Sequence, residues 1–270
     1  MKALVIDNII LYKDKSTRDY YAPSIYSDEF FMRYTSVFEK IRIVAKVFET
    51  DDDLSHLTKL NCANVEIVEL PAYKGLKQMA KNLLVIREKY KDIEKDCDCS
   101  ILRVVQLESI FAILFGRLKK PFAIEVVNDP KTFTKAFSII SAASVTAMRY
   151  FVKNAKGVSY ITEHILQEKY PCTGMTVNGK KKGYFYTNYP TLDLKDSEIC
   201  NPRTYPVKLS HMDIIHVANV IEGTAKGHLT VLNAANIVIN DGYNIDVTFL
   251  GDGISREYYE NYARELGIVE

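Results

Sequence analysis

Short apolar runs alternate along the chain with longer stretches in which apolar residues recur every three or four positions. The runs are rich in β-branched and aromatic residues and predict strands at residues 3–6, 41–48, 65–70, 100–105, 122–127 and 157–162. Strands separated by helices predict parallel pairing with right-handed crossovers, which places the chain in the α/β class.

The stretches between these runs predict helices. Two of them carry apolar side chains that share one face, namely Phe30, Tyr34, Val37 and Phe38 in the first and Leu76, Met79, Leu83 and Ile86 in the second. Residues 107–118 and 132–152 predict two further helices. We therefore expect a doubly wound, Rossmann-like N-terminal domain at residues 1–195.

A change of pattern marks the boundary between two domains. Pro190, Pro202 and Pro206 lie among charged residues and predict a linker, which we place at residues 196–212. A second alternation follows, with strands at residues 213–217 and 245–250 and helices at residues 227–240 and 255–266. Two strand–helix units make half of a usual Rossmann sheet, so residues 213–270 predict the first half of a second Rossmann-like domain.

Composition narrows the class of protein. A net charge of +1 predicts neither a nucleic-acid-binding surface nor an acidic partner. The five cysteines are scattered without a CxxC pair, which fits reduced thiols better than a zinc site. The longest apolar region, residues 101–118, contains charged residues and is too short to span a bilayer, and no signal peptide is evident. We expect a cytoplasmic protein that binds neither nucleic acid nor metal.

Several stretches are similar to one family of enzymes. Residues 217–268 contain Lys226-Gly227 at a helix start and Gly251-Asp252-Gly253 after a strand, and residues 27–47, 119–130 and 152–171 also match in order. Together they resemble GT-B glycosyltransferases of the family 4, or group 1, type, in the branch used for bacterial cell-surface polysaccharide such as capsule. The resemblance implies transfer of a hexose, with retention, from a nucleotide sugar to a glycan or lipid-linked glycan. It implies no metal and no other cofactor.

The chain departs from the family pattern at three places. Asn219 stands where the family often has arginine, and the segment "DNIILYKDKS" at residues 7–16 stands where many members have a Gly-rich loop. The family's Glu-x7-Glu motif, which grips the donor, would lie beyond Glu270. We therefore expect a truncated donor domain, and the alternative function is a catalytically inactive remnant that binds a saccharide or a partner protein.

The chemistry of the leaving group points to candidate donor-site residues. A departing diphosphate needs positive charge, which Lys226 supplies beside the helix that begins near Gly227. By the resemblance, the donor side is also contacted by Asn219 and by the backbone of Gly251, Asp252 and Gly253. The alternatives are a solvated lysine beside a helix start and a tight turn between a strand and a helix.

Candidate reaction-site residues follow strands of the first domain. By the resemblance, Asn128 and Asp129 are predicted as catalytic, because Asp129 faces the interdomain cleft and accepts a hydrogen bond from an acceptor hydroxyl. The alternative is that Asp129 caps the next helix. Thr162 and Glu163 are predicted on the acceptor side of the same cleft, with the alternative that Thr162 caps a helix and Glu163 complements its dipole. His216, inside an apolar strand, is predicted to be a core histidine with satisfied hydrogen bonds.

Two surfaces predict further contacts. Arg117, Lys119 and Lys120 form a basic cluster beside an apolar helix, which suits peripheral contact with the inner face of an anionic membrane. The alternative is a solvated helix end. In the second domain, two parallel strands with two helices leave an exposed edge and an apolar face. We expect the linker, the first domain or a neighbouring chain in an oligomer to cover them.

Overall fold

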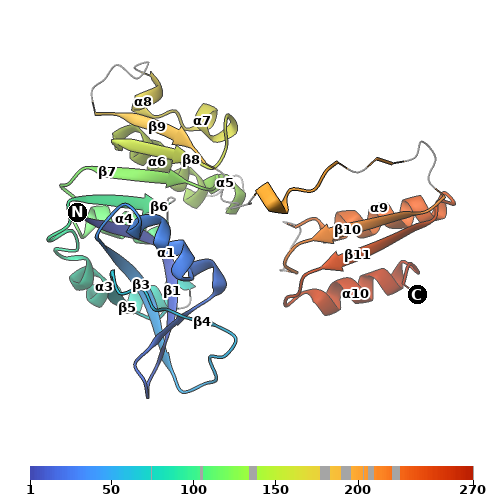
Figure 1. Ribbon diagram of the computed structural model, residues 1–270, viewed down its shortest axis with the longest axis horizontal. Coiled ribbons are helices and arrows are strands. Elements are labelled where there is room, and N and C mark those ends of the chain that lie inside the picture. The colour runs from blue at the N-terminus through green and yellow to red at the C-terminus, as the bar shows by residue number, and fades with distance from the viewer. Residues whose placement is uncertain are drawn as a thin grey trace. The chain divides into compact units, whose positions relative to one another are not determined.

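The computed structural model describes residues 1–73, 75–103, 106–133, 139–176, 183–189, 196–202, 204–205, 210–220 and 226–269 (Figure 1). The chain divides into two compact units, Met1–Asp193 (unit 1) and Leu194–Glu270 (unit 2). Pro190, Pro206 of the predicted linker, and part of the helix predicted at residues 132–152 lie outside the described residues. None of the described helices has both the length and the hydropathy to cross a membrane.

Unit 1 is built on a mainly parallel sheet. Its parallel strands lie in the order β5 (Val65–Pro71), β3 (Lys40–Thr50), β1 (Lys2–Asp14), β6 (Cys99–Arg103), β7 (Phe122–Val126), β8 (Gly157–Tyr160) and β9 (Phe185–Asn188). The chain builds outward from β1 through β3 to β5, then returns to β6 on the other side of β1 and continues away from it (Figure 1). This reversal is a topological switch point, and open α/β sheets bind ligands there, at the carboxyl ends of the strands.

Two apolar cores cover the two faces of this sheet. Leu4 and Ile6 of β1 belong to one core and Ala3 and Val5 to the other, because side chains alternate along a strand. The first core includes residues of α3 (Leu83–Tyr90), α4 (Leu107–Leu114) and α6 (Ile139–Asn154), and the second includes residues of α1 (Asp28–Thr35). The short helices of unit 1 are η1 (Ser24–Tyr26), α2 (Gly75–Lys81), α5 (Pro130–Phe133), α7 (Ile165–Lys169) and α8 (Thr173–Thr176). Buried apolar side chains therefore cover both faces of the sheet, and the predicted doubly wound class is confirmed.

Local predictions differ from the structure in three ways. Helix α1 ends at Thr35, so Val37 lies outside it and is 68% exposed, whereas Phe31 is fully buried. The helix predicted through Leu83 is divided at Asn82 into α2 and α3. Two short strands, β2 (Tyr20–Ala22) and β4 (Thr58–Lys59), pair antiparallel beside β1 and have no apolar run long enough to predict them.

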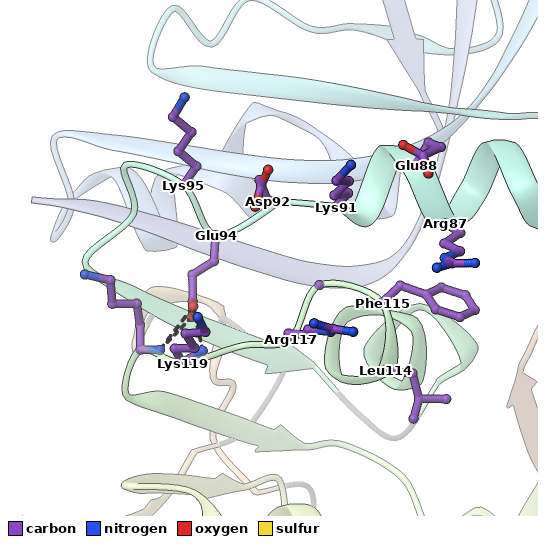
Figure 2. A pocket seen from close by; sticks show the side chains of 12 residues that line it. Arg87, Glu88, Lys91, Asp92, Glu94, Lys95, Leu114, Phe115, Arg117 and Lys119 are labelled. Carbon is purple, nitrogen blue, oxygen red and sulfur yellow. Dashed lines mark hydrogen bonds between the residues drawn. The ribbon is translucent and has the colours of Figure 1, made fainter.

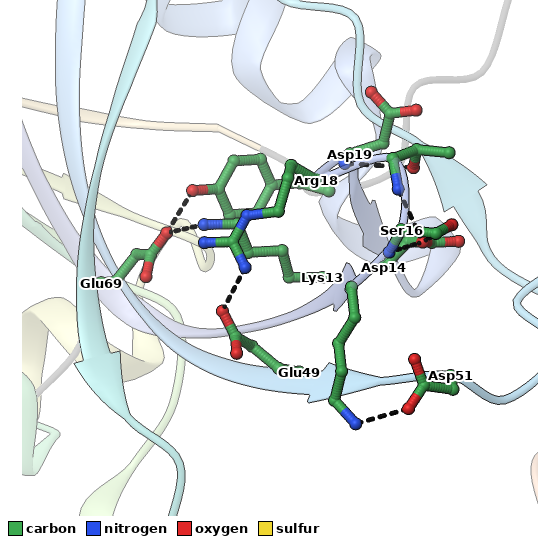
Figure 3. Close-up of polar contacts among 11 residues, drawn as sticks. Lys13, Asp14, Ser16, Arg18, Asp19, Glu49, Asp51 and Glu69 are labelled. Carbon is green, nitrogen blue, oxygen red and sulfur yellow. Dashed lines mark hydrogen bonds and ion pairs between the residues drawn. The ribbon is translucent and has the colours of Figure 1, made fainter.

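The first strand is longer than predicted, because it continues past the edge at which β6 ends. β1 shifts its register against β3 between Val5 and Ile9 and then pairs with β3 as far as Asp14. Ion pairs join its far end to neighbouring strands (Figure 3): Lys13 Nζ to Glu69 Oε1 at 2.5 Å, Arg18 Nη1 to Glu49 Oε1 at 2.9 Å, and Lys15 Nζ to Asp51 Oδ2 at 2.5 Å. Strand β1, with a register shift between Val5 and Ile9, therefore includes residues 7–14, where the resembling family often has a Gly-rich loop.

Unit 2 contains a short 3-10 helix, η2 (Asp196–Glu198), a two-stranded parallel sheet and two long helices. β10 (Met212–Val217) and β11 (Ile245–Leu250) are followed by α9 (His228–Asn240) and α10 (Arg256–Glu265), close to the predicted bounds. Leu232, Tyr259 and Ala263 form the core between these helices and one face of the sheet. On the other face Ile215 and Val217 are exposed, as expected for an open apolar face. What covers this face stays a prediction.

Candidate functional site

Charged side chains gather at the carboxyl ends of the central strands of unit 1. β6 ends at Arg103, whereas β1 continues, and the last residue of β1 that pairs with β6 is Ile6. Asp7 therefore lies directly beyond this pairing, at the switch point, and only 4% of it is exposed. A charge buried to this degree requires partners that compensate its lost hydration.

Arg103 is the centre of the first set of contacts. Its guanidinium nitrogens lie 3.6 Å from Asp7 Oδ2 and 3.7 Å from Glu125 Oε2, and its guanidinium carbon lies 5.0 Å from the centroid of the Phe30 ring. The Tyr34 hydroxyl donates a hydrogen bond to Glu125 Oε2 at 3.0 Å. Burial raises the pKa of Asp7 above its ordinary value, although the charge of Arg103 acts against this shift. Burial also raises the pKa of Tyr34, which keeps its hydroxyl a neutral donor.

Lys46 is the centre of the second set. Its ammonium lies 3.4 Å from Glu108 Oε1 and 4.9 Å from the centroid of the Tyr73 ring, and it donates a hydrogen bond to Asn8 Oδ1. The Tyr73 hydroxyl donates to Glu108 Oε1 at 3.1 Å. The backbone N–H of Asn8 donates to Asp7 Oδ1 at 2.7 Å and so joins the two sets. We call the following residues the switch-point cluster: Asp7, Asn8, Lys46, Arg103, Glu108 and Glu125.

The charge of the switch-point cluster suits a polar, uncharged ligand. Three carboxylates and two cations leave a formal excess of one negative charge, so oxygen acceptors predominate. Sugar hydroxyls are donors that such acceptors can bind. Gln106, three positions after Arg103, adds a further acceptor, because its Oε1 is buried and has no hydrogen-bond partner among the described residues.

The sequence alone did not predict this cluster as a site, although a signal is present. Asp7, Lys46, Arg103 and Glu125 each interrupt a different apolar strand run. Polar residues inside buried strands break the apolar pattern, and such breaks are expected at functional sites. Their meeting depends on the strand order, which the sequence does not give.

Asp129, predicted as a catalytic residue, is already engaged by three donors. Lys169 Nζ lies 2.9 Å from its Oδ2, while the Tyr170 hydroxyl and the N–H of Lys131 donate to its Oδ1 at 2.7 Å and 3.0 Å. Burial acts to raise its pKa, but the hydrogen bonds from Lys169 and Tyr170 outweigh burial and hold the pKa below its ordinary value. The carboxylate is therefore ionised and caps the start of α5, as the structural alternative expects. Catalytic roles for Asp129 and for the neighbouring, half-buried Asn128 stay predictions.

Thr162 and Glu163 lie at the adjacent strand end, after β8. Thr162 Oγ1 accepts a hydrogen bond from the N–H of Leu166 at 3.0 Å and donates one to Gln167 Oε1 at 2.8 Å. Thr162 thus satisfies a free N–H in the first turn of α7, whose N-cap residue is His164, while Glu163 is exposed. Since Lys169 also lies on α7, this helix joins the strand ends that carry Asp129 and Thr162. Contact of Thr162 and Glu163 with an acceptor stays a prediction.

In unit 2, Lys226 and Gly227 directly precede α9. Lys226 is exposed, and Gly227 has a φ of 77°, in the left-handed region that glycine favours. The helix begins at His228, so the lysine charge lies beside the first turn, whose backbone N–H groups have no partner within the helix. This is the local geometry that a diphosphate site needs, and binding of a diphosphate there stays a prediction.

Two histidines of unit 2 pack against each other beneath this helix start. The ring of His228 stacks on Tyr259 at 4.9 Å and meets His216 edge to face at 4.9 Å. Among the described residues, neither ring nitrogen of His228 nor Nε2 of His216 has a hydrogen-bond partner. Burial lowers the pKa of His228, which favours the neutral ring. The prediction that His216 has satisfied hydrogen bonds is therefore wrong for Nε2.

Gly251, Asp252 and Gly253 lie against the segment that follows β10. The N–H of Ala218 donates to the carbonyl of Leu250 at 3.0 Å, and the N–H of Val220 donates to that of Asp252 at 3.1 Å. A Cβ at Gly251 or Gly253 would clash with the carbonyl oxygens of Ala218 and Val220. Close backbone packing thus explains both glycines, as the tight-turn alternative expects. Donor contact by this turn and by the exposed Asn219 between the two hydrogen bonds stays a prediction.

One group of side chains among the described residues has the spacing of metal ligands. His211 Nε2 lies 3.1 Å from Asp213 Oδ1 and 3.4 Å from Asp246 Oδ2, and the three ligand atoms lie within 4.8 Å of one another. The group lies at the amino ends of β10 and β11, the edge opposite Gly251. It is therefore not part of the predicted diphosphate site.

Comparison with known proteins relates the chain to glycosyl-transfer enzymes by fold. No protein-family model matches the chain. Protein CapJ of Staphylococcus aureus is 27% identical to it over 251 residues, which is 90% of this chain and 60% of CapJ. The chain thus spans less than two thirds of the length of this relative. A solved structure of trehalose-6-phosphate synthase, concerned with enzymatic glycosyl transfer with retention, matches with a TM-score of 0.51 at 12% identity and covers 98% of this chain and 67% of that chain.

The structural likeness confirms the expected GT-B-like α/β fold. It extends over nearly the whole chain, and so over elements of both units. The fold therefore agrees with the resemblance of the sequence to GT-B glycosyltransferases. The narrower assignment to the family 4 type stays a prediction.

Proposed function

We propose that the protein is a glycosyltransferase that transfers a hexose from a nucleotide sugar to a glycan or lipid-linked glycan. The observation that carries the proposal is the structural likeness to a glycosyl-transfer enzyme along 98% of the chain. The resemblance to enzymes of bacterial surface polysaccharide, together with the similarity to CapJ over 90% of the chain, supports an acceptor of that class. Retention of anomeric configuration and a cytoplasmic site of action, peripheral to the membrane, belong to the same proposal.

In the proposed reaction, unit 2 holds the donor diphosphate. Negative charge develops on the diphosphate as the sugar leaves, and preorganised positive charge lowers the energy of that state. Lys226 supplies a full charge, and the first turn of α9 supplies about half a charge more. Asn219 and residues 251–253 lie after β10 and β11 at the same sheet edge, where their backbone contacts the rest of the donor. These groups hold the diphosphate without a metal ion.

Unit 1 supplies the polar groups for the acceptor and the reacting sugar. Asp129 is held ionised by Lys169 and Tyr170. It can therefore accept a hydrogen bond from a hydroxyl and stabilise the positive charge that develops at the anomeric carbon. Asn128, Thr162 and Glu163 follow neighbouring strands at the same edge. Within the switch-point cluster, the partly exposed Glu125 adds a further acceptor for sugar hydroxyls.

Replacement of Lys226 by alanine tests the donor half of the proposal. Binding of a panel of UDP-, GDP- and ADP-hexoses is measured by isothermal titration calorimetry. We expect the dissociation constant of the donor that binds to rise at least tenfold, which is about 1.4 kcal/mol. Arg264→Ala is the matched control, because Arg264 is also exposed but lies in the last turn of α10, at the far end of that helix from Gly253.

Two outcomes contradict the proposal in different ways. Equal affinity in Lys226→Ala and the wild type removes the diphosphate role of Lys226. If no nucleotide sugar binds while a surface glycan does, the protein is the saccharide-binding remnant instead. Release of nucleoside diphosphate in the presence of a glycan acceptor, lost in Lys226→Ala and kept in Arg264→Ala, supports transfer.

A further inference from the structure

A basic cavity of about 780 Å³ lies in unit 1, formed by the ends of α3 and α4 and the loops that follow them (Figure 2). Six of the residues that line it are cationic: Arg87, Lys91, Lys95, Arg117, Lys119 and Lys120. Leu114 and Phe115 add an apolar part of the wall. Its volume lies in the range of sites for small molecules.

Within unit 1, the cavity is separate from the switch-point cluster, Asp129 and Thr162. The loop after α3 leads into β6 at Cys99, and the loop after α4 leads into β7 at Phe122. Both loops therefore lie at the amino ends of the parallel strands. The switch-point cluster, Asp129 and Thr162 lie at the carboxyl ends, the opposite edge of the same sheet.

The cations of the cavity are not neutralised by neighbouring side chains. No ion pair within 4.0 Å joins any of the six to a carboxylate among the described residues. Three carboxylates also line the cavity, but Glu94 is 8% exposed and accepts hydrogen bonds from the N–H of Lys119 at 2.7 Å, the N–H of Lys120 at 3.1 Å and the hydroxyl of Ser100 at 3.0 Å. Glu94 therefore holds the two loops together and is not available to a cation.

The negative ends of two helix dipoles could also explain why cations gather at this cavity, but their partial charge is too small. α3 and α4 both end at the cavity, and each helix end carries about half a negative charge. Together they offset about one of the six cations. After three carboxylates are also subtracted, the wall keeps about two positive charges, although the whole chain has a net charge of only +1. Helix ends alone do not account for this excess.

The wall of the cavity is closely packed and shaped before any ligand arrives. A Cβ at Gly116 would lie 2.5 Å from the carbonyl oxygen of Ala112 and 3.3 Å from that of Tyr90, so this glycine lets the two helix ends meet. Arg117 has a φ of 49°, which costs an L-residue about 1–2 kcal/mol. The structure thus places an arginine in a backbone conformation that glycine adopts without this cost.

We propose that this cavity binds a small, soluble anion with at least two negative charges of the phosphate class. Arginine matches the geometry of phosphate oxygens with two parallel hydrogen bonds, and the cavity offers two arginines, Arg87 in the last turn of α3 and Arg117 in the loop after α4. A concave wall with about two excess charges suits a diphosphate group. Leu114 and Phe115 receive an apolar part of the same ligand.

The test measures binding of inorganic pyrophosphate to the full chain at constant ionic strength, followed by calorimetry and phosphorus NMR. The measurement is made in a Lys226→Ala background, so that the proposed donor site does not contribute. Replacing both Arg87 and Lys91 with glutamine should weaken binding at least tenfold. The matched control replaces Lys77 and Lys89, which are exposed on α2 and α3 but do not line the cavity, and should change affinity less than twofold.

A second variant guards against a folding defect. Arg117→Gly relieves the left-handed backbone while removing the guanidinium, so it should keep the fold and still weaken pyrophosphate binding at least fivefold. Affinity equal to that of the starting protein in both cavity variants, or the absence of saturable binding to the starting protein, overturns the proposal.

Vesicles distinguish a soluble ligand from a lipid surface. Co-sedimentation is compared on phosphatidylglycerol and phosphatidylcholine vesicles. The proposal of a soluble ligand is overturned in favour of lipid headgroups by two results together. The protein binds phosphatidylglycerol vesicles and the Arg87 and Lys91 double variant does not, while pyrophosphate shows no saturable binding. Because nucleotide-sugar affinity should be unchanged in the cavity variants, this inference and the proposed glycosyl transfer can fail independently.

Discussion

Replacement of Arg103 by methionine tests whether the switch-point cluster depends on its central cation. The variant keeps a long unbranched side chain but leaves Asp7 and Glu125 without this cation. At an effective dielectric constant of about 20, unit charges 3.6 Å or 3.7 Å apart attract by about 4.5 kcal/mol, so the two pairs amount to about 9 kcal/mol. Burial of the guanidinium offsets much of this attraction, and removing one partner of a buried ion pair costs about 3–5 kcal/mol. We expect a loss of that size for Arg103→Met.

The loss should depend on pH through Asp7. Burial raises the pKa of Asp7 in the folded protein, so ionisation of this carboxyl destabilises the fold as pH rises from its unfolded value, about 3.9, through the raised folded value. Without Arg103 an opposing attraction disappears, and the pKa of Asp7 rises further. The free-energy difference between Arg103→Met and the wild type should therefore be largest near pH 8 and shrink toward about pH 5.

Hydrogen exchange of backbone amides in β6 and β7 measures this free-energy difference in the strands that carry Arg103 and Glu125. It also replaces tryptophan fluorescence, because the chain has no tryptophan. Arg18→Met is the matched control, because its 2.9 Å pair with Glu49 is exposed and should cost less than about 1 kcal/mol. Asp7→Asn added to Arg103→Met should restore part of the loss. A cost below about 1 kcal/mol at pH 8, or a cost that does not vary with pH, would show that water already compensates these charges.

Two further predictions concern unit 2. Gly251→Ala should destabilise this unit by at least about 1 kcal/mol more than Gly242→Ala does. Both glycines have a positive φ, but only a Cβ at Gly251 meets the carbonyl of Ala218. Equal losses of unfolding free energy, measured with urea, would contradict the clash. The hydrogen bond to Asp213 raises the pKa of His211, so its stabilising effect is present below about pH 6.5 and lost as pH rises through the raised value. NMR titration should show a lower His211 pKa in Asp213→Asn, and an unchanged value would refute this cause.

The fold was predictable because both faces of the unit 1 sheet are buried. Strands such as β7 then contain mostly apolar residues, and the helices between the strands keep a regular spacing of apolar positions. Helix breaks were not predictable in the same way. The apolar spacing passes through Asn82, although the chain ends one helix there and starts another. Spacing shows which side chains share a face but not whether the backbone between them is continuous.

The candidate site was only partly predictable, for reasons that differ between residues. The position of Lys226 before a helix follows from local sequence, and the structure places it there. The engagement of Asp129 by Lys169 does not, because those residues are 40 positions apart. The switch-point cluster is further out of reach, since Asp7 and Glu125 come near the same guanidinium only after β1, β6 and β7 are set side by side.

The length of β1 has a consequence for the kinetics and entropy of binding. A mobile loop that folds over a ligand loses conformational freedom on binding and must reopen before the ligand leaves. Here Ile9–Asp14 already pair with β3, and Tyr12 and Lys13 also pair with β2. A ligand at the switch point therefore meets a wall that is ordered before it arrives. Its residence time should reflect the contacts it makes there, with no slow opening of this segment.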